Sequence, residues 1–213
     1  MRFQFVLILI VKSSGINVFH NAYGVGGKTQ TEAKMNVLNY VGNLNGIIAN
    51  RPDVFMRIDS IKDMQEVMKK YGTYYVPTIS AGEFVYEKAQ KPGYFPEIIR
   101  PKALEIGPVI KKTVAMAYKE GVKIAFGTDT DVSPHGDNAH EFEFMVEAGM
   151  APIDALISAN SVAAEALGIN DIGQIKEGMK ADIISVPGDP IKDIYLVMKV
   201  DFVMKDGVVY KQW

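Results

Sequence analysis

Residues 122–130 read Val-Lys-Ile-Ala-Phe-Gly-Thr-Asp-Thr, an apolar stretch with alternating and β-branched residues that ends in Gly-Thr-Asp. This pattern predicts a buried β-strand, and the turn residues that follow, from Ser133 to Gly136, predict where it ends. A carboxylate just after the C-terminal end of a buried strand can bind a metal or act as a general base. Asp129 is therefore the first candidate functional residue. By position alone, a turn or helix cap is an equally good interpretation.

The residues after this strand narrow the interpretation. Residues 133–142 read Ser-Pro-His-Gly-Asp-Asn-Ala-His-Glu-Phe, and residues 145–150 read Met-Val-Glu-Ala-Gly-Met. With Gly-Thr-Asp, this order resembles the last barrel strand and following helix of the amidohydrolase superfamily, nearest to its imidazolonepropionase/Xaa-Pro dipeptidase-like branch. The resemblance implies that Asp129 is a metal ligand and the base that takes the proton of the attacking water.

The resemblance continues downstream. Residues 152–168 predict two short amphipathic helical turns closed by Gly168. Residues 171–184 are similar to the family signature Leu-Gly-x-Ile-x-x-Gly-x-x-Ala-Asp, at which the family's chain leaves the barrel for a small β-sandwich. Residues 200–210 predict a hairpin with Asp206-Gly207 at its tip.

Upstream, residues 68–78 predict a helix closed by Gly72 and then a short strand. We expect residues 80–84 to form a loop over the active-site face, followed by a helix over residues 111–120. The strands at 74–76 and 123–126 are expected to be parallel, with a helical crossover between them.

The predicted fold class is α/β. It consists of a partial (β/α)8 TIM-type barrel over residues 1–168 and the C-terminal strands of a composite β-sandwich over residues 169–213. A complete barrel typically takes ~250 residues, whereas this chain has 213. The apolar run at residues 5–11 favours a buried parallel strand over the alternative, a degenerate signal segment.

Few metal ligands are present. The resemblance implies His-x-His on the first strand, a bridging Lys or Glu on the fourth, and single histidines on the fifth and sixth. This chain has three histidines and no His-x-His. His20 resembles the fifth-strand ligand, although one inserted residue would shift the strand register. A gapless match places Met56 at the sixth-strand histidine. Asp129 and His20 are therefore the candidate ligands of a divalent metal, zinc by preference.

Two further residues are candidates for substrate binding. His135 and Asn138 lie in the loop after Asp129, where the similar family segment faces the substrate. A tight turn at residues 134–136 is the competing interpretation for His135. His140, on the helix that follows, is expected at the surface.

Composition limits the partners. A net charge of −2 with 23% charged residues provides no basic surface, which argues against nucleic acid. The apolar run at the N-terminus is too short to cross a membrane. With no cysteine, thiolate metal sites are excluded. A cytoplasmic location is favoured over secretion.

The implied activity is hydrolysis of a C–N bond in a cyclic amide or dipeptide-like substrate. Because the ligand set is incomplete, the chain is expected to be a truncated or fragmentary member of the enzyme family. Whether this chain is active by itself is left open by the sequence. The alternative is a non-catalytic half-barrel remnant that associates with itself or with a partner chain. Unpaired strand edges favour association, so we expect a homo-oligomer or a partner chain over the open barrel edges.

Overall fold

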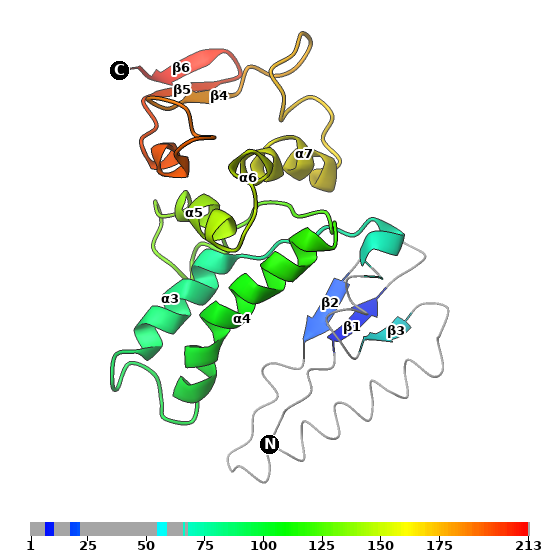
Figure 1. The fold of residues 1–213 in the computed structure, drawn as a ribbon. Helices are drawn as coiled ribbons and strands as arrows, with labels where there is room; N and C mark the ends of the chain where they lie inside the picture. Colours follow the sequence, from blue (N-terminus) through cyan, green and yellow to red (C-terminus); the bar gives the residue numbers. More distant parts are fainter. Residues whose placement is uncertain (1–6, 11–17, 22–54, 59–65, 67, 213) are drawn as a thin grey trace. The chain divides into compact units, whose positions relative to one another are not determined.

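The computed structural model describes residues 7–10, 18–21, 55–58, 66 and 68–212 (Figure 1). The chain divides into two compact units, Met1–Thr73 and Tyr74–Trp213. The domain boundary predicted between residues 168 and 169 falls within the second unit and stays a prediction.

The first unit contains a three-stranded sheet. Its strands are β1 (Leu7–Ile10), β2 (Val18–Asn21) and β3 (Phe55–Ile58), in the order β2-β1-β3. Both pairs are antiparallel, so the N-terminal strand is confirmed but its predicted parallel direction is wrong. An apolar run indicates burial on both faces of a strand and does not encode the direction of its neighbours.

The helix predicted before Gly72 is also present, at residues 68–71. Gly72 has a φ of 64°, and the Thr73 N–H donates to the Met68 carbonyl over 2.9 Å. A left-handed glycine and this bond form the usual C-terminal closure of a helix.

In the second unit, the two extended segments pair as predicted. Tyr75 and Ile124 form a parallel bridge, in which the Tyr75 N–H donates to the Lys123 carbonyl over 2.8 Å and the Ala125 N–H donates to the Tyr75 carbonyl over 3.0 Å. The parallel direction is confirmed, although the pair is a single bridge rather than a long ladder. Helices α3 (Ile79–Ala89) and α4 (Arg100–Lys119) lie in the connection between the two segments.

Helices α3 and α4 pack side by side as a helical hairpin (Figure 1). The loop predicted at residues 80–84 is wrong, because these residues belong to α3 and Ser80 is buried. Helix α4 starts earlier than the predicted residue 111, with Pro101 in its first turn, where proline is well tolerated. The two helices approach closely at Gly82, where a Cβ would lie 2.4 Å from Ile110 Cδ1.

Three shorter helices follow: α5 (His140–Glu147), α6 (Pro152–Ala159) and α7 (Ser161–Leu167). The two helical turns predicted at residues 152–168 are confirmed, and Gly168 ends α7 with a φ of 69°. The core of this unit includes Ile79, Val114 and Met145, each fully buried. None of the described helices is long and apolar enough to cross a membrane.

The chain ends in an antiparallel sheet with the order β4-β5-β6. Its strands are β4 (Ile183–Ser185), β5 (Phe202–Lys205) and β6 (Val208–Lys211), and the 3-10 helix η1 (Ile194–Met198) precedes β5. The predicted hairpin is confirmed. Asp206 and Gly207 both have positive φ, of 49° and 78°, as the tight turn of a two-residue hairpin requires.

Candidate active site after the Gly-Thr-Asp segment

Asp129 lies just after the extended segment that carries Ile124, as predicted. Its backbone is left-handed, with a φ of 51°, and its side chain is exposed. The Val132 N–H donates to its carbonyl over 3.2 Å and starts a turn there. Among the described residues none donates a hydrogen bond to the Asp129 carboxylate, so it caps no described helix and is open to a ligand.

Asn138 is joined to the two residues that flank Asp129. Its Nδ2 donates to Thr130 Oγ1 over 2.8 Å and to Thr128 Oγ1 over 3.2 Å. The two threonine hydroxyls are themselves hydrogen-bonded, at 2.7 Å. The structure therefore brings Asn138 to the Gly-Thr-Asp-Thr segment, and its substrate-binding role stays a prediction.

His135 is not joined to that group. Its side chain is 81% exposed, and its Nε2 lies 3.1 Å from Asp131 Oδ1, a carboxylate that is equally exposed. Gly136 has a φ of 100°, which fits the competing interpretation of a tight turn at residues 134–136. The substrate role of His135 stays a prediction. His140 is half-exposed and its Nδ1 lies 2.8 Å from Glu143 Oε2, in line with the predicted surface position.

His20 belongs to the first unit. It lies in β2, opposite Ile8 of β1, and its side chain is outside the described residues. Met56, at the position of the sixth-strand histidine, lies in β3 opposite Leu9. The predicted role of His20 as a metal ligand therefore stays a prediction.

The described residues do not assemble a metal site by themselves. No group of three or more His, Asp or Glu side chains comes together within them. Catalytic zinc usually has three protein ligands, and Asp129 is the single candidate for which the structure describes the side chain. The described residues thus fall short of the donor set that a catalytic zinc needs.

Sequence reasoning missed Glu141, the most buried charged residue in this region. It is fully buried in α5, yet its carboxylate accepts three hydrogen bonds from the start of α3. Ile79 N donates to Oε1 over 2.8 Å, and Ser80 N and Ser80 Oγ donate to Oε2 over 2.7 and 2.6 Å. A signal was available, because Glu141 shares the buried face of α5 with Met145 at a spacing of four.

The electrostatics of this group follow from its burial. Burial raises the pKa of the Glu141 carboxyl, and the hydrogen bonds from Ser80 and Ile79 oppose that rise. Burial, followed by the charge of Glu141, raises the pKa of Tyr75 to about 12. Because carboxylates stabilise helix N-termini, Glu141 fastens the first turn of α3 to α5. Ser80 Oγ also lies 3.3 Å from the Thr128 carbonyl, so the group reaches the residue before Asp129.

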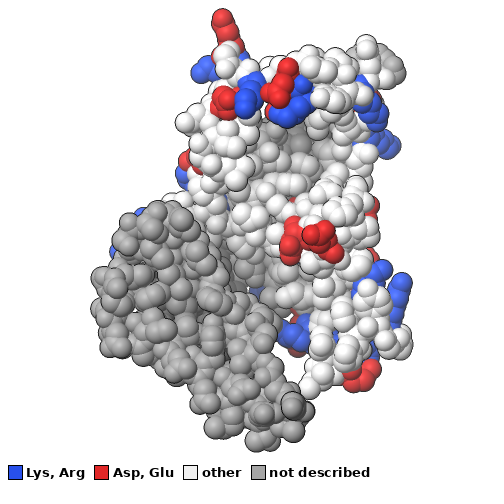
Figure 2. Space-filling view, turned by 180° about the vertical axis from the view of Figure 1, so that it is seen from behind, with Lys and Arg blue, Asp and Glu red and all other residues white. Residues whose placement is uncertain are grey.

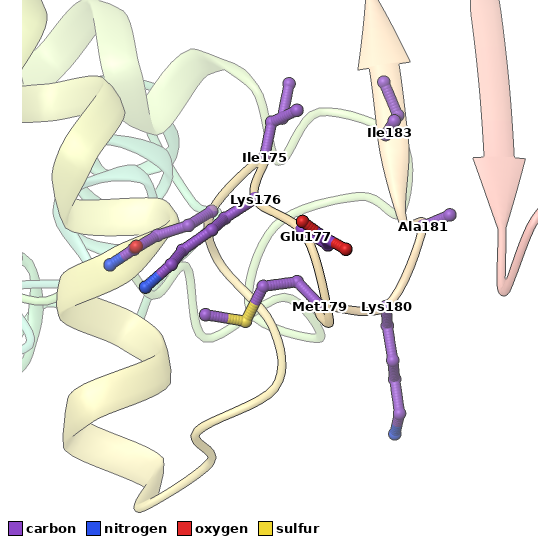
Figure 3. A pocket seen from close by; sticks show the side chains of 8 residues that line it. Ile175, Lys176, Glu177, Met179, Lys180, Ala181 and Ile183 are labelled. Carbon is purple, nitrogen blue, oxygen red and sulfur yellow. The ribbon is translucent and has the colours of Figure 1, made fainter.

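A separate pocket of about 380 Å³ lies after α7 and is lined by Gln174, Ile175, Lys176, Glu177, Met179, Lys180, Ala181 and Ile183 (Figure 3). In Figure 3 the Lys180 side chain extends away from Lys176 and Met179. The pocket contains none of the predicted site residues. Acidic and basic side chains both occur on the described face in Figure 2, in small groups.

Comparison with known proteins places these features in a wider context. Residues 46–210 match the amidohydrolase family. The chain is 33% identical over 156 residues to an ochratoxinase of Aspergillus niger, a match that covers 70% of this chain and 32% of that protein.

Solved structures are also similar. A Xaa-Pro dipeptidase with bound methionine in its active site is 50% identical, with a TM-score of 0.68, over 71% of this chain and 37% of that one. The A. niger ochratoxinase structure is 32% identical, with a TM-score of 0.61, over 70% of this chain and 35% of that one. The chain spans about a third of the length of the curated relatives it matches.

Proposed function

Because the chain belongs to the amidohydrolase family, an enzyme family of hydrolases, we propose that it carries the C-terminal part of a metal-dependent enzyme that cleaves C–N bonds. The substrate class we propose is a dipeptide-like molecule or a cyclic amide. The observation that carries the proposal is the open carboxylate of Asp129, at the end of a segment that pairs in parallel with Tyr75.

The fold of the relatives is TIM-barrel-like. We propose that residues 1–168 supply part of such a barrel and residues 169–213 part of a β-sandwich. The antiparallel sheet β2-β1-β3 of the first unit counts against the barrel assignment for that unit, because barrel strands are parallel. The parallel bridge between Tyr75 and Ile124 supports the first assignment, and the antiparallel sheet β4-β5-β6 supports the second. Active sites of such barrels lie at the C-terminal ends of the strands, which is where Asp129 lies along its own segment.

In this proposal Asp129 accepts the proton of the attacking water and passes it to the leaving nitrogen, first as general base and then as general acid. His135 and Asn138 bind the substrate, and Asp129 and His20 contribute to the metal site. A divalent metal, zinc by preference, would supply Lewis acidity and lower the pKa of its bound water when held there. Since the described residues do not complete its ligand set, no catalytic step is assigned to a metal on this chain alone.

The purified 213-residue protein is expected to bind zinc weakly and to hydrolyse Xaa-Pro dipeptides far more slowly than an intact relative. Asp129→Asn should weaken zinc binding at least about tenfold and abolish residual turnover, since it removes a ligand and the base. Metal analysis, zinc titration and a hydrolysis assay measure both effects. Asp171→Asn is the control, because the Asp171 carboxylate is half-exposed and pairs with Lys180. This variant should change neither zinc binding nor turnover.

Two results of this experiment would contradict the proposed incomplete zinc site at Asp129. Equal zinc binding by the native protein and the Asp129→Asn variant would refute the role of Asp129. Tight stoichiometric zinc, with turnover that disappears in the variant, would mean that another route completes the site, such as ligands from a second copy.

Association is the second part of the proposal. Val76, at the end of the segment that pairs with residues 123–125, is 48% exposed. Apolar residues at an open strand edge favour pairing with another chain. The pure protein is expected to sediment as a homo-oligomer that Val76→Lys weakens, whereas Val109→Lys, on the exposed face of α4, should not. If the protein sediments as a monomer at all concentrations, the homo-oligomer is refuted and a different partner chain is the remaining form of association. The cytoplasmic location stays a prediction.

A further inference from the structure

We propose that Asn138 and Thr130 are positioning residues that hold the backbone of Asp129 and thereby aim its carboxylate. The catalytic consequence rests on the function proposed above for Asp129. The conformational part rests on the geometry of residues 128–130 alone.

The hydrogen bonds of Asn138 close a small ring around Asp129. Both Nδ2 protons are used, one on Thr128 Oγ1 and one on Thr130 Oγ1. One of the threonine hydroxyls donates to the other, over 2.7 Å. The side chains on either side of Asp129 are thus joined to each other and to the same amide.

This ring spans a residue in an unfavourable conformation. Asp129 has a φ of 51°, in the left-handed region that residues with a Cβ adopt rarely, although aspartate does so more readily than most. Backbone of this kind persists where the surroundings determine it. Linking the two flanking side chains does so, because the link restricts the separation and orientation of residues 128 and 130.

One end of the ring lies in a buried part of the molecule. Thr128 is 9% exposed, and its carbonyl lies 3.3 Å from Ser80 Oγ. Ser80 is in turn held by the buried Glu141 carboxylate over 2.6 Å. The single Ser80 hydroxyl proton goes to Glu141 at this distance, so the Thr128 carbonyl is only a near neighbour of α3, while the Thr128 hydroxyl is hydrogen-bonded to Asn138. The contacts place Asp129 next to a buried residue whose hydroxyl is hydrogen-bonded to Asn138.

Asn138 keeps one polar atom free. Its Oδ1 accepts no hydrogen bond from any residue that the structure describes, while both donors are occupied. The amide oxygen is thus the part of Asn138 that is open to a substrate N–H or O–H. Asn138 would then bind the substrate through Oδ1 and hold Thr128 and Thr130 through Nδ2.

The test compares Thr130→Val, which removes the hydroxyl at nearly constant shape, with Thr130→Ser, which keeps it; Asn138→Leu removes both donors. The first readout is the NMR contact between the amide and α protons of Asp129, which are close together when φ is near 50°. The second is zinc affinity. We expect Thr130→Val and Asn138→Leu to weaken the contact and to lower zinc affinity about tenfold, and Thr130→Ser to retain both.

The outcomes separate the two proposals. An unchanged contact in both Thr130→Val and Asn138→Leu overturns the positioning role. So does native zinc affinity in these variants, if Asp129→Asn itself loses zinc. If Asp129→Asn leaves zinc binding unchanged, the metal role of Asp129 fails, and the NMR contact alone decides whether Asn138 and Thr130 hold its backbone. Should Asn138→Leu fail to fold, the Thr130 pair decides.

Discussion

Replacing Glu141 by methionine is expected to lower the free energy of unfolding by about 2–4 kcal/mol. Each buried donor left without a partner costs about 1–3 kcal/mol, and the change leaves the N–H groups of Ile79 and Ser80 unpaired in the core. Ser80 Oγ loses less, because the Thr128 carbonyl is within reach as an alternative acceptor. Methionine has nearly the length of glutamate, so the cavity term is small.

Glu147→Met is the matched control on the same helix. Glu147 is 44% exposed and pairs with Lys111 over 2.7 Å. Exposed ion pairs contribute only about 0–1 kcal/mol, and glutamate and methionine have similar helix propensities. Urea unfolding of both variants beside the native protein measures the difference. Equal losses in the two variants would mean that the Glu141 hydrogen bonds do not stabilise the junction of α3 and α5.

Gly173→Ala is expected to cost about 3 kcal/mol of stability. Gly173 has a φ of 83°, and a Cβ there would lie 2.7 Å from the Asn160 carbonyl oxygen and 3.0 Å from Ala164 Cβ. The first of these neighbours is backbone and cannot rotate away. The clash adds about 1–3 kcal/mol to the left-handed penalty of about 1–2 kcal/mol.

Gly178→Ala isolates the conformational part of that cost. Gly178 has nearly the same φ, 84°, but no atom lies within 4 Å of a Cβ built there. Alanine at position 178 should therefore cost only the left-handed penalty. Thermal or urea unfolding of the two variants gives the comparison, and an equal cost at both positions would show that the loop at Gly173 moves away from α7 without loss.

Local sequence signals predicted the ends of helices and the positions of turns well. Gly72, Gly168 and Asp206-Gly207 end two helices and turn one hairpin where expected, because a positive φ is a property of the residue and its immediate neighbours. The bounds of α4 were predicted less well. The helix was predicted to begin at residue 111, whereas it begins at Arg100.

In the candidate site too, local sequence patterns were predicted and long-range contacts were not. Asp129 was found from the sequence because a strand followed by Gly-Thr-Asp is a local pattern. Asn138 was predicted as a substrate-binding residue, but its hydrogen bonds to Thr128 and Thr130 were not. Glu141 was missed, since its partners come close only when the chain folds. Glu141 meets Ser80 across 61 positions of sequence, and no periodicity encodes that contact.

The sequence by itself thus determined the amidohydrolase resemblance, the position of Asp129 and the shortage of histidine ligands. These follow from residue types and short spacings. Only the tertiary structure decided that residues 80–84 are helical rather than a loop and that β1 has antiparallel neighbours. In the first case a buried carboxylate from α5 satisfies the N–H groups at the start of α3. In the case of β1, the direction of pairing depends on which strands lie beside it, and the pattern of its side chains does not encode that direction.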